Sequence, residues 1–408
     1  MRVITLDDLA GLTATLPGNP RLVVSGNFAT PLEALAVFDR ELAEYRLFML
    51  NAQLGIPDRV GVTPESAFVG PGMRHSPRLH YVPCRLSLVP FLFSRTMPPD
   101  VVLIHTTPVA NGAVSLGVEV NILPAAIEAC RARGGIVIAQ ANTRMPFTVG
   151  DATVPVEAID YLVEVDEPLP AKEPTDPDDM SLEIGERIAA RVADGSTLQL
   201  GIGAVPDAVL HRLLDRRGLR VWTEMFSDGV LKLDAHGALD SNAKLTTSFI
   251  FGSQALYDWV DHNGRVHMVR TEHSNDPSLI ARQPLMTSVN AALQVDLFGQ
   301  ANASRINTRI HSGFGGQTDF IVGALHAVGG QAFIAMKSWH PKAQVSTIVP
   351  LLDEPVTSFQ HSAVVTENGV AEIWGYNQQE QARNLIEQAA HPDIREELWE
   401  EAAGLGLA

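Results

Sequence analysis

The chain has 408 residues, which is long enough for two domains that each bury a core of their own. Hydrophobic residues make up 46% of it, a fraction that excludes a disordered protein and favours a compact globular one. The formal net charge of −17 argues against a nucleic-acid partner, because such an interface must neutralise phosphates with lysine and arginine side chains.

Cys84 and Cys130 are the only cysteines, so the sequence indicates neither a disulfide framework nor a cysteine metal site. The N-terminal residues lack the basic start and the apolar core of a signal peptide. No apolar run reaches the ~18 residues that a membrane span needs. We therefore expect a cytoplasmic protein with neither a membrane partner nor a bound metal ion.

Residues 21–165 alternate between apolar runs and stretches with helical periodicity. Helices are predicted at residues 31–44 and 123–133. Buried strands are predicted at residues 21–26, 46–50, 101–106, 135–140 and 161–165. This alternation is typical of a largely parallel sheet with helices on its faces.

Residues 166–179 read DEPLPAKEPTDPDD and are rich in proline and acidic side chains. A stretch of this composition has little to bury, which predicts a linker. We therefore expect an N-terminal α/β domain at residues 1–170 and a C-terminal α/β domain at residues 171–408.

The second half of the chain repeats the α/β pattern. Ile184, Ile188 and Val192 recur one helical turn apart, and residues 378–401 predict a long closing helix. Further strands are predicted at residues 249–251, 266–269, 293–297, 332–336 and 362–366. Together, the two halves predict two similar open, largely parallel α/β domains.

Residues 197–229 form the stretch around which the second domain is organised. An apolar run ends at Gly201 and Gly203, a helix follows with Pro206 in its first turn, and a second apolar run ends at Glu224. This pattern predicts a βαβ unit with parallel strands and a right-handed crossover. The glycine turn and Glu224 would then meet at the carboxyl edge of the sheet, where open α/β folds bind ligands.

Several interpretations of this edge compete. A glycine turn followed about 20 residues later by an acid resembles the dinucleotide fingerprint, but Pro206 stands where the third glycine belongs. A tight turn beside a solvated acid is a purely structural alternative. A Ser-x-x-Lys pattern at Ser241 and Lys244 lacks the Lys-Thr-Gly partner of a serine nucleophile.

A fourth interpretation makes Glu224 a nucleophile that attacks an activated acyl group. The attack creates an oxyanion, so backbone N–H donors must lie nearby. A second glycine cluster, at residues 313–320, could supply them as an anion-binding concavity, although it could equally be a turn between strands. Composition alone leaves these alternatives open.

Ordered motifs along nearly the whole chain resemble the acetyl-CoA hydrolase/transferase family, which includes acetate, butyrate and 4-hydroxybutyrate CoA-transferases. LQLGIGAVPDA at residues 198–208 and TEMFSDG at residues 223–229 carry most of the resemblance. Other matching motifs are SNDP at 274–277, NAALQVDL at 290–297, the glycine cluster at 313–320, STIVP at 346–350, VTENGVA at 365–371 and AHPDIR at 390–395. The N-terminal half adds VGP at 69–71, YVP at 81–83, GD at 150–151 and IDYLVE at 159–164.

The resemblance implies a role for each matching residue. Glu224 matches the family's nucleophile, which takes the acyl group as an anhydride and then carries coenzyme A as a glutamyl thioester. Asn275 matches an asparagine that orients this carboxylate, and Gly316 matches a glycine that contacts coenzyme A and helps to hold the oxyanion. The remaining residues that match the surroundings of coenzyme A are Gly201, Ile202, Gly203, Ala204, Val205, Gly315 and Lys337.

The resemblance also implies an acyl-CoA:carboxylate CoA-transferase that acts on a short-chain acyl-CoA by double displacement. Its active site would lie between the two domains of a homodimer, with coenzyme A as substrate and no permanently bound cofactor. The alternative is a hydrolase on the same scaffold, in which water takes the acyl group. A coenzyme-A-sensing protein without catalysis is a third candidate, against which the retained Glu224 argues.

The chain departs from the family pattern in three places. Arginine is usual within residues 357–361, which here read TSFQH. Tyrosine is usual at Asn368 and arginine at Trp374. In relatives these positions lie near the part that shapes the acyl or carboxylate end, so the acyl chain and the acceptor stay open.

Overall fold

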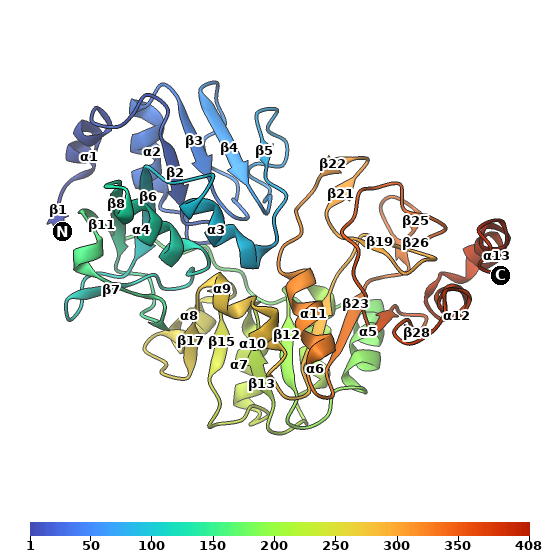
Figure 1. Cartoon of the computed structure of the whole chain (residues 1–408). Helices are drawn as coiled ribbons and strands as arrows, with labels where there is room; N and C mark the ends of the chain where they lie inside the picture. The colour runs from blue at the N-terminus through green and yellow to red at the C-terminus, as the bar shows by residue number, and fades with distance from the viewer. The chain divides into compact units, whose positions relative to one another are not determined.

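The computed structural model describes all residues, 1–408, and forms two compact units (Figure 1). Unit 1 comprises Met1–Glu173, Leu245–Ser274 and Ile310–Gly315. Unit 2 comprises Pro174–Lys244, Asn275–Arg309 and Gly316–Ala408. Both units combine helices with mostly parallel strands, which confirms the predicted α/β class.

Unit 1 is built on an eight-stranded sheet in which every neighbouring pair is parallel. In spatial order its strands are β1 (Arg2–Val3), β11 (Tyr161–Val165), β8 (Ile136–Asn142), β6 (Val101–Thr106), β2 (Arg21–Val24), β3 (Tyr45–Phe48), β4 (Val62–Ser66) and β5 (His80–Tyr81). Five of these strands, β2, β3, β6, β8 and β11, were predicted. The sequence pattern did not predict the other three.

The helices of unit 1 include both predicted ones, α2 and α4. The α-helices are α1 (Leu6–Thr13), α2 (Leu32–Glu41), α3 (Val89–Ser94), α4 (Leu123–Ala132), α8 (Gln254–Val260) and α9 (Thr271–Ser274), with 3-10 turns at Leu86–Leu88 and Val156–Ala158. Further strands are β7 (Ala113–Ser115), β9 (Val149–Gly150), β10 (Thr153–Pro155), β15 (Leu245–Thr247), β16 (Phe249–Ile250) and β17 (Val266–Met268). Side chains from β2, β3 and α2, including Leu22, Leu47 and Phe38, form part of a fully buried core.

Unit 2 is built on a sheet whose strands run parallel except for the last, β28, which is antiparallel to its neighbour. In spatial order these strands are β28 (Val370–Glu372), β27 (Ala363–Val365), β23 (Gln331–Ala335), β18 (Thr287–Asn290), β12 (Thr197–Leu200) and β13 (Arg220–Trp222). Its α-helices are α5 (Asp179–Ala189), α6 (Ala204–Arg212), α7 (Asp228–Ala235), α10 (Pro277–Ile280), α11 (Gln317–His326), α12 (Gln378–Asn384) and α13 (Arg395–Gly404).

Short strands occupy the connections of unit 2. They are β14 (Met225–Phe226), β19 (Gln294–Asp296), β20 (Ala301–Asn302), β21 (Arg305–Ile306), β22 (Arg309–Ile310), β24 (Trp339–His340), β25 (Val345–Ser346) and β26 (Ile348–Val349). The side chains of Phe320 on α11 and Ile334 on β23 belong to the hydrophobic core of this unit.

The single long helix predicted at residues 378–401 is wrong. Helix α12 ends at Asn384, a π-helical turn covers Leu385–Ala389, and a 3-10 turn at Pro392–Ile394 precedes α13. Pro392 explains the break, because proline lacks an N–H donor and pushes the residue before it out of the helical region. That residue, His391, has φ −59° and ψ 136°.

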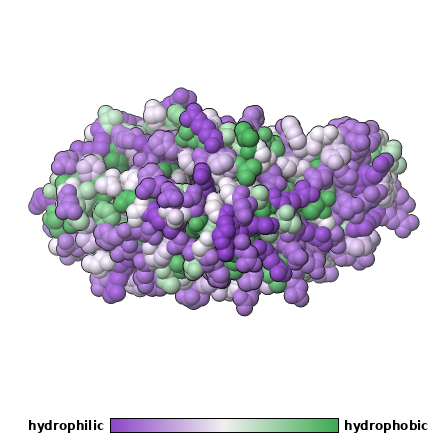
Figure 2. All heavy atoms as spheres, turned by 90° about the horizontal axis from the view of Figure 1, so that it is seen from below, coloured by the Kyte–Doolittle hydropathy of each residue, from purple (hydrophilic) through white to green (hydrophobic).

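The surface drawn in Figure 2 is mainly hydrophilic, with small hydrophobic areas scattered between the polar side chains. None of the helices combines the length and the apolar composition that a membrane crossing requires.

Candidate active site

The βαβ unit predicted at residues 197–229 consists of β12, α6 and β13. The two strands pair in parallel, as predicted, with Leu198 opposite Val221. Just beyond the strands, the hydroxyl of Thr223 lies 3.1 Å from the carbonyl oxygen of Leu200, which ties the two strand ends together. Glu224 therefore follows β13 at the same carboxyl edge at which Gly201 follows β12.

The carboxylate of Glu224 is held by a side-chain amide. Asn275 Nδ2 donates a hydrogen bond to Glu224 Oε2 at 2.9 Å. Asn275 is fully buried, in the short connection between α9 and α10. A buried donor of this kind fixes the direction of the carboxylate, because its hydrogen bond to a charged group is stronger than one between neutral groups.

Gly316 packs directly against the hydrogen-bonded side chains of Glu224 and Asn275. A Cβ atom added at Gly316 would lie 2.2 Å from Glu224 Oε2 and 2.2 Å from Asn275 Nδ2. The backbone of Gly316 has φ −94°, which any residue can adopt, so glycine is needed here for space and not for conformation. Gly316 is also the N-cap of α11, so the first turn of α11 follows directly from this contact.

The environment of Glu224 changes its acidity. The residue keeps some exposure to solvent, yet the protein packed around its carboxyl group raises the pKa of Glu224 to about 7, mainly by desolvation. The hydrogen bond from Asn275 lowers this pKa, and the negative charge of Asp319 raises it. Asp319 is fully buried in the first turn of α11. Both protonation states of Glu224 are therefore populated near neutral pH.

The glycine turn beside Glu224 is open. Gly203, the N-cap of α6, has φ +123°, a conformation that side chains rarely adopt. A Cβ atom at Gly201 or Gly203 would meet nothing within 4 Å, and the side chain of Ile202 is 46% exposed. The turn also leads into Ala204 and Val205, the first residues of α6, whose N–H groups have no partner within the helix. The geometry leaves room for a ligand beside these donors.

Lys337 follows β23 at this same edge but is already paired. Its Nζ lies 2.7 Å from Asp178 Oδ2 in an ion pair. The other oxygen of Asp178, Oδ1, accepts a hydrogen bond from the backbone N–H of Ser181 and caps α5. The last residues of the predicted linker thus belong to α5 and its cap.

Gly315 is the last residue of its segment in unit 1, and its neighbour Gly316 belongs to unit 2. It has φ +57°, and a Cβ atom there would lie 3.0 Å from Phe68 Cε2. Its carbonyl oxygen accepts a hydrogen bond from the N–H of Leu86 at 3.1 Å. Of the predicted site residues, the structure brings Glu224, Asn275 and Gly316 into direct contact.

A polar cluster at the ends of β12 and β18 was missed. Ser288 Oγ donates to Gln199 Oε1 at 2.6 Å, and Asn290 Nδ2 donates to the same oxygen at 3.2 Å. Gln199 is buried between Leu198 and Leu200 in β12, and this polar residue between two leucines was the signal in the sequence. Asp319 was missed as well, because nothing local separates it from an ordinary helix-start acid.

The three departures from the family pattern lie at different edges of the unit 2 sheet. Residues 357–361 precede β27, and the N–H of Trp374 donates to the Ser362 carbonyl, so both lie at the amino edge. Asn368 follows β27 at the carboxyl edge, where its Nδ2 donates to Ser338 Oγ at 2.9 Å. Only Asn368 therefore shares the sheet edge of Glu224.

His361, the last residue of the segment 357–361, is fully buried, and neither of its ring nitrogens has a hydrogen-bond partner. Burial lowers the pKa of this imidazole to about 4, so it is neutral at physiological pH. A neutral ring cannot replace the charge of the arginine that is usual in this segment.

No group of three or more histidine, cysteine, aspartate or glutamate side chains is arranged to hold a metal ion. The donors at the carboxyl edge are amides, hydroxyls, backbone N–H groups and the Lys337 ammonium, which suit an anionic or carbonyl-bearing ligand.

Comparison with known proteins identifies relatives of the whole chain. It is 40% identical to the 4-hydroxybutyrate coenzyme A transferase of Clostridium kluyveri over 339 residues, which cover 80% of this chain and 78% of that protein. It is 36% identical to the succinyl-CoA:acetate/propanoyl-CoA:succinate CoA transferase of Fasciola hepatica, with 94% of this chain and 84% of that protein covered. The crystal structure of 4-hydroxybutyrate CoA-transferase from Porphyromonas gingivalis superposes with a TM-score of 0.83 at 32% identity, covering 99% of this chain and 98% of that one.

Family profiles agree with these similarities. The acetyl-CoA hydrolase/transferase N-terminal domain matches residues 61–171, and the acetyl-CoA hydrolase/transferase C-terminal domain matches residues 252–402. The fold, the extent of these matches and the identity to the relatives lead to one conclusion: the chain belongs to the acetyl-CoA hydrolase/transferase family of enzymes.

Proposed function

We propose that this protein is an acyl-CoA:carboxylate CoA-transferase that works by double displacement with Glu224 as the nucleophile. The observation that carries the proposal is the carboxylate of Glu224, held by buried Asn275 and hemmed in by Gly316 beside an open glycine turn. A carboxylate in a fixed direction, near the backbone N–H groups at the start of α6, has what attack on a thioester requires.

The first half of the reaction places coenzyme A on the enzyme. The ionised carboxylate of Glu224 adds to the thioester carbonyl carbon, the carbon–sulfur bond breaks, and coenzyme A leaves as a thiolate, which produces a mixed anhydride. The thiolate then adds to the glutamyl carbonyl carbon and expels the first carboxylate, which leaves a glutamyl thioester. The acceptor carboxylate repeats these two steps in reverse and leaves as the new acyl-CoA.

Each addition creates an oxyanion that needs hydrogen-bond donors. We assign this task to the backbone at Gly316 and to the turn at Gly201–Val205, with Gly315 beside them, and we place the coenzyme A thioester against these residues. Lys337 is proposed to meet the nucleotide phosphates. Loss of one oxyanion donor typically costs roughly 10²–10³ in rate.

Hydrolysis is the alternative, because the family includes acetyl-CoA hydrolases as well as transferases. The two activities differ only in whether water or a carboxylate attacks the covalent intermediate. Incubation with acetyl-CoA, with and without acetate, succinate or 4-hydroxybutyrate, separates them. A transferase exchanges acyl groups and releases little thiol, whereas thiol release that no acceptor affects supports the hydrolase.

Mass spectrometry tests the covalent step itself. After incubation with an acyl-CoA, we expect the peptide that contains Glu224 to carry the mass of coenzyme A less one water. The adduct should be absent from Glu224→Ala. An adduct on another residue, or none under any trapping condition, would contradict the mechanism. Complete lack of turnover with every short acyl-CoA would instead support a coenzyme-A-sensing protein.

The proposal includes the assembly and the place of the enzyme. We expect a homodimer in the cytoplasm, with acyl-CoA and a small carboxylate as its substrates and no permanently bound cofactor. Light scattering on the purified chain measures the assembly directly, and a monomer at micromolar concentration would contradict it.

A further inference from the structure

Residues 66–99 of unit 1 contain no aspartate or glutamate, although the whole chain has 47 acidic residues and a formal net charge of −17. The basic residues of this stretch are Arg74, His75, Arg78, His80, Arg85 and Arg95. Charges of one sign that gather in an otherwise acidic protein create a local positive potential, which attracts anions.

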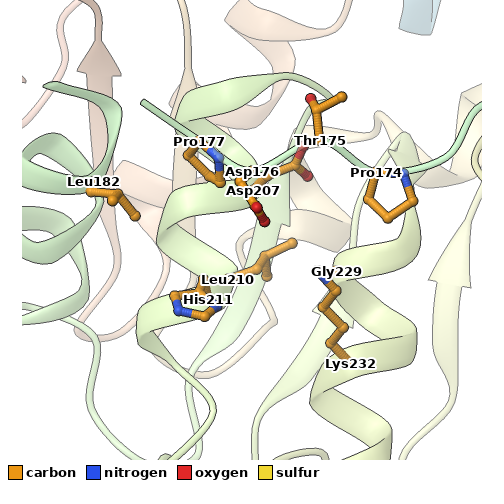
Figure 3. Close-up of a pocket in the computed structure, with 10 residues that line it drawn as sticks. All are labelled: Pro174, Thr175, Asp176, Pro177, Leu182, Asp207, Leu210, His211, Gly229 and Lys232. Atoms are coloured by element: carbon orange, nitrogen blue, oxygen red, sulfur yellow. The ribbon is translucent and has the colours of Figure 1, made fainter. Parts of the chain in front are cut away.

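The pocket drawn in Figure 3 has no such uniform charge. It lies in unit 2, has a volume of about 200 Å³ and is formed by residues 174–177 together with α5, α6 and α7. Its charged side chains are of both signs, namely Asp176, Asp207, His211 and Lys232. The basic stretch of unit 1 is therefore the clearer indication of a charged ligand.

Arg74 is the member of this stretch that has donors to spare. Its Nε donates to the carbonyl oxygen of His311 at 2.7 Å, and this is the sole hydrogen bond of the side chain. The two terminal nitrogens bond no protein group and are not buried. An arginine held in this way presents a pair of free donors, which match the two oxygens of a carboxylate or a phosphate.

Two histidines accompany Arg74, and no carboxylate balances the group. His75 is the next residue in the chain, and His311 supplies the carbonyl that Arg74 binds. Burial lowers the pKa of His311, and the positive charges of Arg74 and His75 lower it further, so the three groups lie in one another's field. Desolvation also lowers the pKa of the Arg74 guanidinium. A bound anion would relieve this repulsion.

The backbone ties the basic stretch to the first part of the glycine cluster. The N–H of Val69 donates to the Ser312 carbonyl at 2.7 Å, and the N–H of Leu86 donates to the Gly315 carbonyl at 3.1 Å. Gly316, which packs against Glu224, is the next residue in the chain. The carbonyl that holds Arg74 thus belongs to the same loop that supplies a glycine to the candidate active site.

We infer that Arg74, together with His75 and His311, binds an oxyanion, that is, a carboxylate or a phosphate group. The proposed function offers two sources of such a group. One is the second carboxylate of a dicarboxylate acceptor, and the other is a phosphate of coenzyme A. The inference rests on the proposed function only for these two sources, because free phosphate is a third.

Inorganic phosphate is the probe for the site itself. In isothermal titration calorimetry, Arg74→Gln should bind phosphate at least about tenfold more weakly than the unmodified protein, because a charged two-pronged donor is lost. Arg78→Gln is the matched control, since it removes the same charge from the same stretch. Arg78 is already ion-paired with Asp58, so its loss should change the phosphate affinity less than about twofold at physiological salt. Equal affinity in Arg74→Gln and the unmodified protein, or an equal loss in both variants, would overturn the inference.

Chemical labelling tests the site without any substitution. Phenylglyoxal modifies accessible guanidinium groups, and fragment mass spectra distinguish Arg74 from Arg78. Phosphate should slow the modification of Arg74 in the unmodified protein and leave that of Arg78 nearly unchanged. Labelling of Arg74 that phosphate does not slow would contradict the site.

Substrate kinetics of Arg74→Gln identify the source of the oxyanion. A raised KM for succinate but not for acetate assigns it to the second carboxylate of the acceptor. A raised KM for acetyl-CoA but not for acetyl-dephospho-CoA assigns it to the 3′-phosphate of coenzyme A, and unchanged KM values assign it to free phosphate. Failure of the proposed function looks different: no Glu224 adduct forms, whereas Arg74 still binds phosphate.

Discussion

Substitution of Gly316 by alanine tests the arrangement around the nucleophile with a single methyl group. The added Cβ would lie 2.2 Å from both Glu224 Oε2 and Asn275 Nδ2, well inside the 3.0 Å that real Cβ atoms keep from other heavy atoms. Glu224, Asn275 or α11 must therefore move. Because the backbone at position 316 suits any residue, the change is confined to this contact.

The size of the effect follows from the hydrogen bond that is lost. A hydrogen bond to a charged group is worth about 1.5–3 kcal/mol, and each 1.36 kcal/mol of barrier is about a factor of ten in rate. A misplacement of about 1 Å at a reacting group can cost roughly 10²-fold. We therefore expect Gly316→Ala to lower kcat by about 10- to 100-fold.

The assay compares acyl exchange and adduct formation in three proteins. Gly404→Ala is the control, because Gly404 ends α13, has φ outside the left-handed region and would place its Cβ in open space. The melting temperature of Gly316→Ala should stay close to that of the unmodified enzyme while its kcat falls. Gly316→Ala with full activity would refute the proposal that this contact positions the nucleophile.

Three further predictions concern protonation and charge. Since Glu224 must be ionised to attack, kcat/KM should fall as pH drops through about 7. Asn275→Ala should move this fall in kcat/KM to higher pH, because the hydrogen bond that lowers the pKa of Glu224 is gone. Coinciding pH–rate profiles of the two proteins would contradict this prediction. The pKa of Glu224 in the folded protein lies above the ordinary glutamate value of 4.5, so ionisation of Glu224 disfavours the folded state. Glu224→Gln should therefore raise the melting temperature at pH 8 and leave it little changed at pH 4, and an increase of equal size at both pH values would argue against the raised pKa. Lys337→Ala should raise the KM for acyl-CoA more than it changes kcat. The control Asp178→Ala, which frees Lys337 from its ion pair, should not raise this KM. Equal KM values in the unmodified enzyme and both variants would contradict a role for Lys337 in binding acyl-CoA.

The sequence predicted the parts of the fold in which hydrophobic pattern and local chemistry agree. The strands β2, β6 and β12 and the turn into α6 belong to this class. Strand β4 was missed because it contains Pro64 and Glu65, which are unusual inside a buried strand. The structure explains Glu65 by a buried ion pair with Arg21, at 2.7 Å, whose partners lie too far apart in the chain for pattern reasoning to connect them.

The sequence could nominate residues for the candidate site but not their geometry. Motif resemblance singled out Glu224, Asn275 and Gly316, which lie far apart in the sequence, yet only the folded chain brings them into contact. The buried charge of Asp319 beside Glu224 depends on how α11 packs and left no local signal. The division of the chain at residue 170 stays a prediction.

The ion pair of Lys337 with Asp178 has a consequence for any anion that docks at this edge. Such an anion does not add to a vacant cation but exchanges with an internal carboxylate, so its net electrostatic gain is the difference between two pairings. The carboxylate it releases still caps α5 through Oδ1, so the exchange leaves the start of this helix intact. Occupancy of the carboxyl edge is thus linked, through Lys337, to the side chain that begins α5.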